Sequence, residues 1–162
     1  MDSLQWGRLP ELGIEEIDRE HREILDLMSR LRNVLRAPSP GRAGQEALGS
    51  ILDEGVSFIQ KHFASEETMM QQSLYPGYLD HKKEHELFLG RLLDLRSQMQ
   101  TGAKMLTLDT LNLMGNWLHH HVLETDKPLV PHLVKAALLE PPVLPAGPDA
   151  ARESSLQPSK RP

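Results

Sequence analysis

Two pairs of side chains in the sequence have the types and the spacing that a metal ion could use. His62 and Glu66 are four residues apart, and so are His81 and His85. On an α-helix, residues four apart lie about 40° apart around the axis and about one turn apart along it, so both side chains can reach the same ion. These pairs therefore predict a metal site built on helices.

A third pair has a different spacing. His121 and Asp126 are five residues apart, which on a regular α-helix turns their side chains roughly 140° away from each other. A π-type turn takes about one residue more and would bring them to the same face. Pro128 already removes a backbone hydrogen bond close by. We therefore predict a π-type or broken turn between His121 and Asp126.

Helices must position these side chains, and the apolar pattern predicts four of them. Apolar residues recur at helical spacing in four blocks, which are separated by stretches rich in Gly, Pro, Ser and Thr. We expect helices over roughly residues 18–36, 44–72, 78–100 and 108–126. Short connections favour antiparallel neighbours, so the expected fold is all-α, an up-down-up-down four-helix bundle.

Each of the four apolar faces carries at least one histidine, including His21 on the first. One such histidine would ordinarily be a core residue with a normal hydrogen-bond partner. Five imidazoles and two carboxylates in one core are costly to bury unless a cation compensates them. Seven ligands exceed what one ion usually takes, and carboxylates can bridge, so the pattern favours two ions. Without cysteine, the ligands are nitrogen and oxygen, which suit iron, zinc, copper, nickel or manganese.

Length, charge and composition narrow the classes of protein. A chain of 162 residues with 39% hydrophobic content predicts a single domain, and a net charge of −5 without a basic stripe predicts no nucleic-acid partner. We expect no membrane span and no signal peptide, and therefore a cytoplasmic protein.

Six prolines lie between Pro141 and Pro162. We expect the bundle domain over residues 1–136 and a disordered Pro-rich tail over 137–162.

At the metal-capable residues the chain resembles the bacterial hemerythrins, from Trp6 to about Lys127. The resemblance lies in four motifs: Gly13-Ile14-x-x-Ile17-Asp18-x-x-His21, His62-Phe63-x-x-Glu66-Glu67-x-x-Met70, Tyr75-Pro76 leading to His81-x-x-x-His85-x-x-Phe88, and Trp117-Leu118-x-x-His121-x-x-x-x-Asp126. All seven ligand positions of that family hold its residue types in order, which is a highly specific match.

The resemblance implies a centre of two iron ions joined by an oxo or hydroxo group. It implies that His81, His85 and His121 bind one iron, which is coordinatively full. It implies that His21 and His62 bind the other iron, which keeps an open position. Glu66 and Asp126 would bridge the two. Dioxygen would bind at the open position. Because neutral imidazoles outnumber carboxylates, we expect the ferric state to be stabilised less than in carboxylate-rich oxidases, and binding to be reversible.

Four residues match positions that line the oxygen pocket of that family: Phe63, Trp117, Leu118 and Val122. An apolar wall would admit dioxygen and hinder water. Plain bundle core is the alternative interpretation, and for Phe63 the two have equal weight. His119 and His120 match no ligand position, and helical phase predicts that they are exposed.

The expected function is that of an oxygen carrier, store or local supplier, without catalytic residues. One alternative is an enzyme in which the same centre acts on nitric oxide or peroxide. Another is an oxygen or redox sensor whose C-terminal tail docks onto a protein partner. We expect a monomer.

Overall fold

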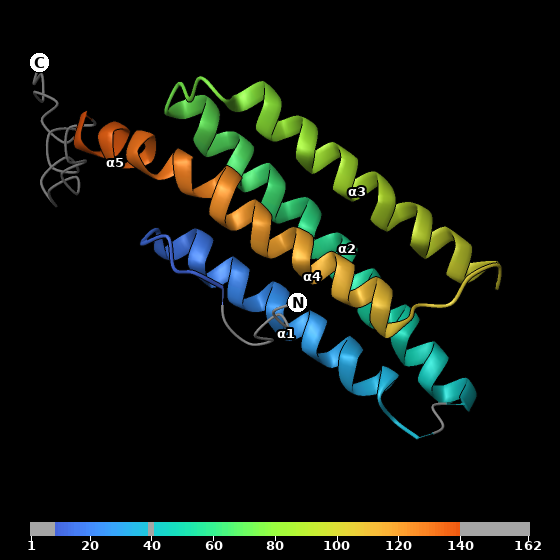
Figure 1. Ribbon diagram of the computed structural model, residues 1–162. Helices are drawn as coiled ribbons and strands as arrows, with labels where there is room; N and C mark the ends of the chain where they lie inside the picture. The colour runs from blue at the N-terminus through green and yellow to red at the C-terminus, as the bar shows by residue number, and fades with distance from the viewer. Residues whose placement is uncertain (1–8, 39–40, 140–162) are drawn as a thin grey trace, which may run out of the picture.

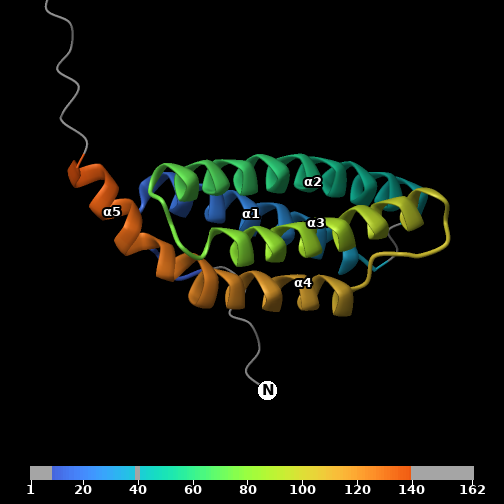
Figure 2. The ribbon, with the colours of Figure 1, turned by 90° about the horizontal axis from the view of Figure 1, so that it is seen from above.

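The computed structural model describes residues 9–38 and 41–139, and within them the protein is all-helical. Four long helices lie lengthwise beside one another and alternate in direction (Figures 1 and 2). They are α1 (Glu15–Leu35), α2 (Gly41–Gln72), α3 (Tyr78–Gln100) and α4 (Leu108–His121). The expected up-down-up-down four-helix bundle is confirmed.

Local signals explain where these helices begin and end. Glu15, Glu16 and Asp18 place negative charge in the first turn of α1, where the helix dipole favours it. The Thr107 hydroxyl accepts a hydrogen bond from the Thr110 backbone N–H (3.1 Å) and so caps the start of α4. Gly102, with a φ of 72°, provides the left-handed turn that follows α3.

The segment before α1 is held against the bundle by a single carboxylate. The Asp18 side chain is buried and accepts hydrogen bonds from the backbone N–H groups of Leu12 (2.7 Å) and Gly13 (2.9 Å). Both donors precede the helix and have no helical partner of their own. Asp18 therefore fixes the path by which the chain enters α1, one turn before His21.

The chain leaves α4 through a π-helical segment, η1 (Val122–Asp126), as predicted. A short 3-10 segment, η2 (Lys127–Leu129), and a fifth helix, α5 (Val130–Leu139), follow it. We expected Pro128 to disturb the end of the fourth helix and did not predict α5. Pro128 stands at the start of η2, where a missing N–H costs nothing, so it begins a new helical segment instead.

Helix α5 projects past the end of the bundle (Figure 2) and carries helical structure to residue 139, beyond the boundary expected at 136. Trp6, and the part of the expected tail beyond residue 139, lie outside the described residues. Among the described helices, none combines the length and the apolar character that crossing a membrane requires.

Candidate metal centre

All seven predicted ligands point into the bundle, and each is at most 2% exposed. Every long helix contributes. His21 lies on α1, His62 and Glu66 on α2, His81 and His85 on α3, His121 on α4 and Asp126 at the end of η1. The structure therefore brings together, at one level of the bundle, residues that are up to 105 positions apart in the sequence.

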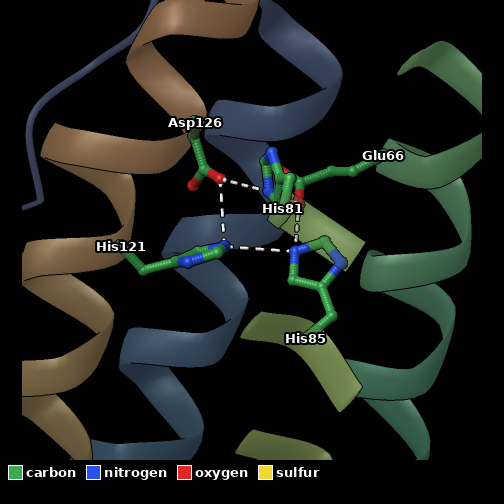
Figure 3. A group of neighbouring side chains, drawn as sticks. All are labelled: Glu66, His81, His85, His121 and Asp126. Carbon is green, nitrogen blue, oxygen red and sulfur yellow. Dashed lines mark hydrogen bonds and ion pairs between the residues drawn. The ribbon is translucent and has the colours of Figure 1, made fainter. Parts of the chain in front are cut away.

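Five of these side chains form one compact group, drawn in Figure 3. The ligand atoms of Glu66, His81, His85, His121 and Asp126 all lie within 4.8 Å of one another. Oδ1 of Asp126 is 3.1 Å from Nε2 of both His81 and His121, and Oε2 of Glu66 is 3.2 Å from Nε2 of His85. Three imidazoles and two carboxylates thus converge on one point.

The other two histidines form a second group that shares a member with the first. His21, His62 and Glu66 also have ligand atoms within 4.8 Å of one another. Asp126 reaches this group as well, because its Oδ2 lies 3.4 Å from Nε2 of His21. Both carboxylates therefore stand between the two groups, as bridging ligands would.

The buried polar atoms of the two groups are short of hydrogen bonds. Within the described part of the chain, both carboxylate oxygens of Glu66 and of Asp126, and Nε2 of His21, His62 and His81, lie close to one another but form no hydrogen bond of good geometry. Buried polar groups in proteins nearly always form such bonds, so this many atoms that face one another without them need an explanation. Bound cations would pair with all of them, and the residues therefore fit a metal centre.

The charges of the carboxylates agree with this fit. Burial would raise the pKa of Asp126, but His121, His21 and His81 beside it hold that pKa well below its usual range. Burial likewise opposes ionisation of Glu66, but the contacts with His62 and His85 lower its pKa. Both side chains are thus held as carboxylates, the form that binds a cation.

The π-helical segment explains how two residues five apart share this centre. In η1 the extra residue in the turn brings Asp126 to the same face as His121, with Nε2 and Oδ1 only 3.1 Å apart. His121 and Asp126, whose five-residue spacing does not fit one face of a regular α-helix, are thus brought together by the π-helical turn. π-Bulges are frequent at functional sites, and this one serves the metal group directly.

Three outer carboxylates near the centre were missed in the sequence. They contact the outward-facing Nδ1 atoms of predicted ligands: Glu20 at 2.8 Å from His62, Glu67 at 3.4 Å from His85, and Glu84 at 3.1 Å from His121. Such partners commonly orient metal-binding histidines. Each directly adjoins a predicted ligand in the sequence, and that adjacency could have identified them.

The predicted pocket residues lie beside the centre. Phe63 stacks on the ring of His85 (centroids 3.8 Å apart, planes 6° apart), and Trp117 stacks on His121 (4.5 Å and 16°). Phe63, Trp117 and Leu118 line an apolar cavity of about 30 Å³, more than the roughly 10–15 Å³ that one water-sized molecule needs. Val122 is fully buried in the same core but does not line this cavity.

Each long helix contributes a cavity wall three residues from a ligand. Ile24 follows His21, Ile59 precedes His62, Phe88 follows His85 and Leu118 precedes His121. Met28 and Met114 also line the cavity and lie seven residues from the ligands of their helices. The cavity therefore lies about one helical turn from the ligands, on the side toward the apolar core. His119 and His120 are exposed, as predicted.

Known proteins resemble this chain over the same region. The family profile described as "Hemerythrin HHE cation binding domain" matches residues 12–133. The bacteriohemerythrin of Stenotrophomonas maltophilia (strain R551-3) is 32% identical over 127 residues, covering 78% of this chain and 79% of that protein. The myohemerythrin of Sipunculus nudus is 41% identical over 125 residues, covering 77% and 89%.

A solved structure agrees in fold as well as in sequence. A crystal structure of wild-type hemerythrin superimposes with a TM-score of 0.68 at 28% identity, covering 74% of this chain and 88% of that one. The region that the family profile matches, residues 12–133, contains all four long helices and all seven residues of the two groups. The chain belongs to the hemerythrin family.

Proposed function

We propose that this protein binds dioxygen reversibly at a centre of two iron ions, which His21, His62, Glu66, His81, His85, His121 and Asp126 hold. The observation that carries the proposal is the pair of overlapping ligand groups, one with three histidines and one with two, with both carboxylates between them. Two ions at these groups would share Glu66 and Asp126 as bridges.

One group holds three histidines and the other holds two, which supports binding of dioxygen at only one of the two ions. The group of His81, His85 and His121 would offer one ion three imidazoles together with both carboxylates. The group of His21 and His62 would offer a second ion one imidazole fewer, and so would leave more room there for an external ligand. Bound iron would supply the electrons that a reversible complex with dioxygen requires.

The apolar cavity supports uptake of a small uncharged molecule. Its lining is Ile24, Met28, Ile59, Phe63, Phe88, Met114, Trp117 and Leu118, without a titratable side chain. These residues exclude water and offer no acid or base to drive catalytic turnover. We therefore favour an oxygen carrier, store or supplier over an enzyme that acts on nitric oxide or peroxide.

The test is iron content together with optical spectra of the purified protein, reduced under nitrogen and then exposed to air. We expect two irons per chain and a visible band that appears with dioxygen and disappears when it is removed. Oxidation without a reversible band, with consumption of nitric oxide or peroxide, would favour the enzyme. Absence of iron would overturn the proposal.

Two neighbouring histidines of α4 provide a matched pair of variants for this experiment. His121 is buried in the five-residue group, whereas His119 is exposed two residues earlier. His121→Ala should lose iron and the reversible band, and His119→Ala should keep both. Equal behaviour of the two variants would contradict the assignment of the site.

A further inference from the structure

The three outer carboxylates follow one rule of connection. Each adjoins a predicted ligand on its own helix and contacts a histidine on the next helix along the chain. Glu20, beside His21 on α1, contacts His62 on α2; Glu67, beside Glu66 on α2, contacts His85 on α3; Glu84, beside His85 on α3, contacts His121 on α4. Each carboxylate thus ties one helix of the centre to the following one.

Glu84 differs from the other two because a single one of its oxygens contacts both the ligand histidine and the segment that follows it. Its Oε2 lies 3.1 Å from Nδ1 of His121 and accepts a hydrogen bond from the Thr125 hydroxyl at 3.0 Å. Thr125 belongs to η1 and directly precedes Asp126. One carboxylate oxygen of α3 therefore contacts both a ligand histidine and the π-helical segment that carries the bridging aspartate.

We propose that Glu84 is a positioning residue of the metal centre, which acts through His121 and Thr125 to orient the imidazole and to hold the π-helical segment in place. The proposal rests on the metal centre of the proposed function. With Nδ1–H donated to Glu84, the lone pair of Nε2 on His121 points toward Asp126 and the centre. With Thr125 held, Asp126 stays on the same face.

The other outer carboxylates are less suited to this role. Glu67 is 3.4 Å from its histidine and also accepts a hydrogen bond from Lys82 at 2.6 Å, which offsets its charge. Glu20 contacts His62 closely, but α2 is regular there and needs no support. Glu84 alone among the three touches the irregular turn.

The experiment uses the full-length chain loaded with zinc, which is diamagnetic and allows NMR of the histidines. The variants are Glu84→Ala, Glu84→Gln and Thr125→Val. The matched control is Glu86→Ala, which removes the same charge from α3 at a side chain that is 63% exposed and pairs only with Lys82 among the ion pairs described. Glu84 itself is 46% exposed, so its removal leaves no large cavity.

Two readouts separate positioning from general stability. The first is the rate at which a chelator removes zinc, and Glu84→Ala should raise it roughly 10–100-fold, the usual cost of losing an outer partner of a ligand histidine. Glu84→Gln should raise it less, because its amide oxygen still accepts. Thr125→Val should also raise it, and Glu86→Ala should leave it unchanged. The second readout is the ¹⁵N–¹H signal of Nδ1–H on His121, which should weaken through solvent exchange only when Glu84 is altered.

The outcomes are distinct. Zinc release and a His121 signal unchanged in Glu84→Ala would overturn the proposal and leave the metal centre intact. A wild-type chain that takes up neither zinc nor iron would overturn the centre and the proposal together. If Glu84→Ala lost its helical circular dichroism, Glu84→Gln and Thr125→Val would decide, because both keep a side chain of similar size.

Discussion

The two ends of the bundle are filled by different chemistry. At one end, the interior contains five imidazoles and two carboxylates, all buried. At the other end, where α1 finishes and α4 starts, it consists of aliphatic side chains such as Leu31, Leu48, Leu95 and Leu111. The same four helices pass through both ends.

This difference shows what stabilises each end. Burial of apolar surface stabilises the aliphatic end without any ligand, at roughly 25 cal/mol per Å². The polar end has buried polar atoms without hydrogen bonds of good geometry, so we expect a bound cation to stabilise it and to couple metal binding to folding there. Four predictions, from the largest expected effect to the smallest, test this division.

The two carboxylates that we propose as bridges, Glu66 and Asp126, should be the most sensitive positions. Glu66→Ala or Asp126→Ala removes a residue that contacts both ligand groups, so metal affinity should fall by more than the roughly 10–100-fold expected for an outer partner. Helicity should also fall. Metal analysis and circular dichroism measure both effects, with exposed Glu124→Ala as the control for Asp126. Iron content close to that of the wild type would refute the bridging role.

At the aliphatic end, the effect should fall on stability alone. Leu111 is completely buried, and Leu111→Ala should lower the free energy of unfolding by about 2–5 kcal/mol through the cavity it leaves. The number of metal ions per chain should not change. Urea unfolding of Leu111→Ala and of the exposed Leu113→Ala gives the comparison. A specific loss of metal from Leu111→Ala would contradict the separation of the two ends.

Asp18 tests whether every buried charge at the polar end needs the metal. Its carboxylate is satisfied by two backbone N–H groups, so Asp18→Ala should cost about 1–3 kcal/mol through the loss of those bonds. The cost should be equal in the metal-free and the metal-loaded protein, measured by urea unfolding against exposed Glu16→Ala. A cost seen only with metal would make Asp18 part of the centre.

The surface between the ends should matter least. Arg30 and Glu54 join α1 and α2 through two hydrogen bonds of 2.8 Å, but the two side chains are 42% and 53% exposed, so solvent screens the pair. Arg30→Ala should change the melting temperature less than any variant above, and the change should shrink further in high salt. A shift as large as that of Asp18→Ala would show that the pair is more than a surface contact.

The sequence predicted the parts of this molecule that depend on local periodicity. The third helix was predicted with the observed bounds, Tyr78–Gln100, because Pro76-Gly77 and Thr101-Gly102 mark both of its ends. The π-helical turn was predicted because a five-residue spacing conflicts with two residues sharing one interior face. In both cases the information lies within a few residues.

What the sequence did not predict depends on how helices pack. Helical phase places Glu84 away from the apolar face of its own helix, and only the position of α4 beside it brings its carboxylate to His121 and Thr125. Helix α5 was missed for a different reason, because Pro128 was expected only to disturb the far end of the fourth helix, whereas it lies in the first turn of another helical segment.

In terms of chain length, the π-helical segment contains one residue more than a regular α-helical turn, and the extra residue is accommodated within that segment. A chain one residue shorter between His121 and Asp126 would have the four-residue spacing of the other pairs and could use an ordinary helix. The segments that follow would stay in phase, so His132 on α5 would still pack against Tyr75, with ring centroids 5.0 Å apart. A single deletion between His121 and Asp126 therefore need not disturb the rest of the bundle, although it would remove the π-helical turn to which Thr125 belongs.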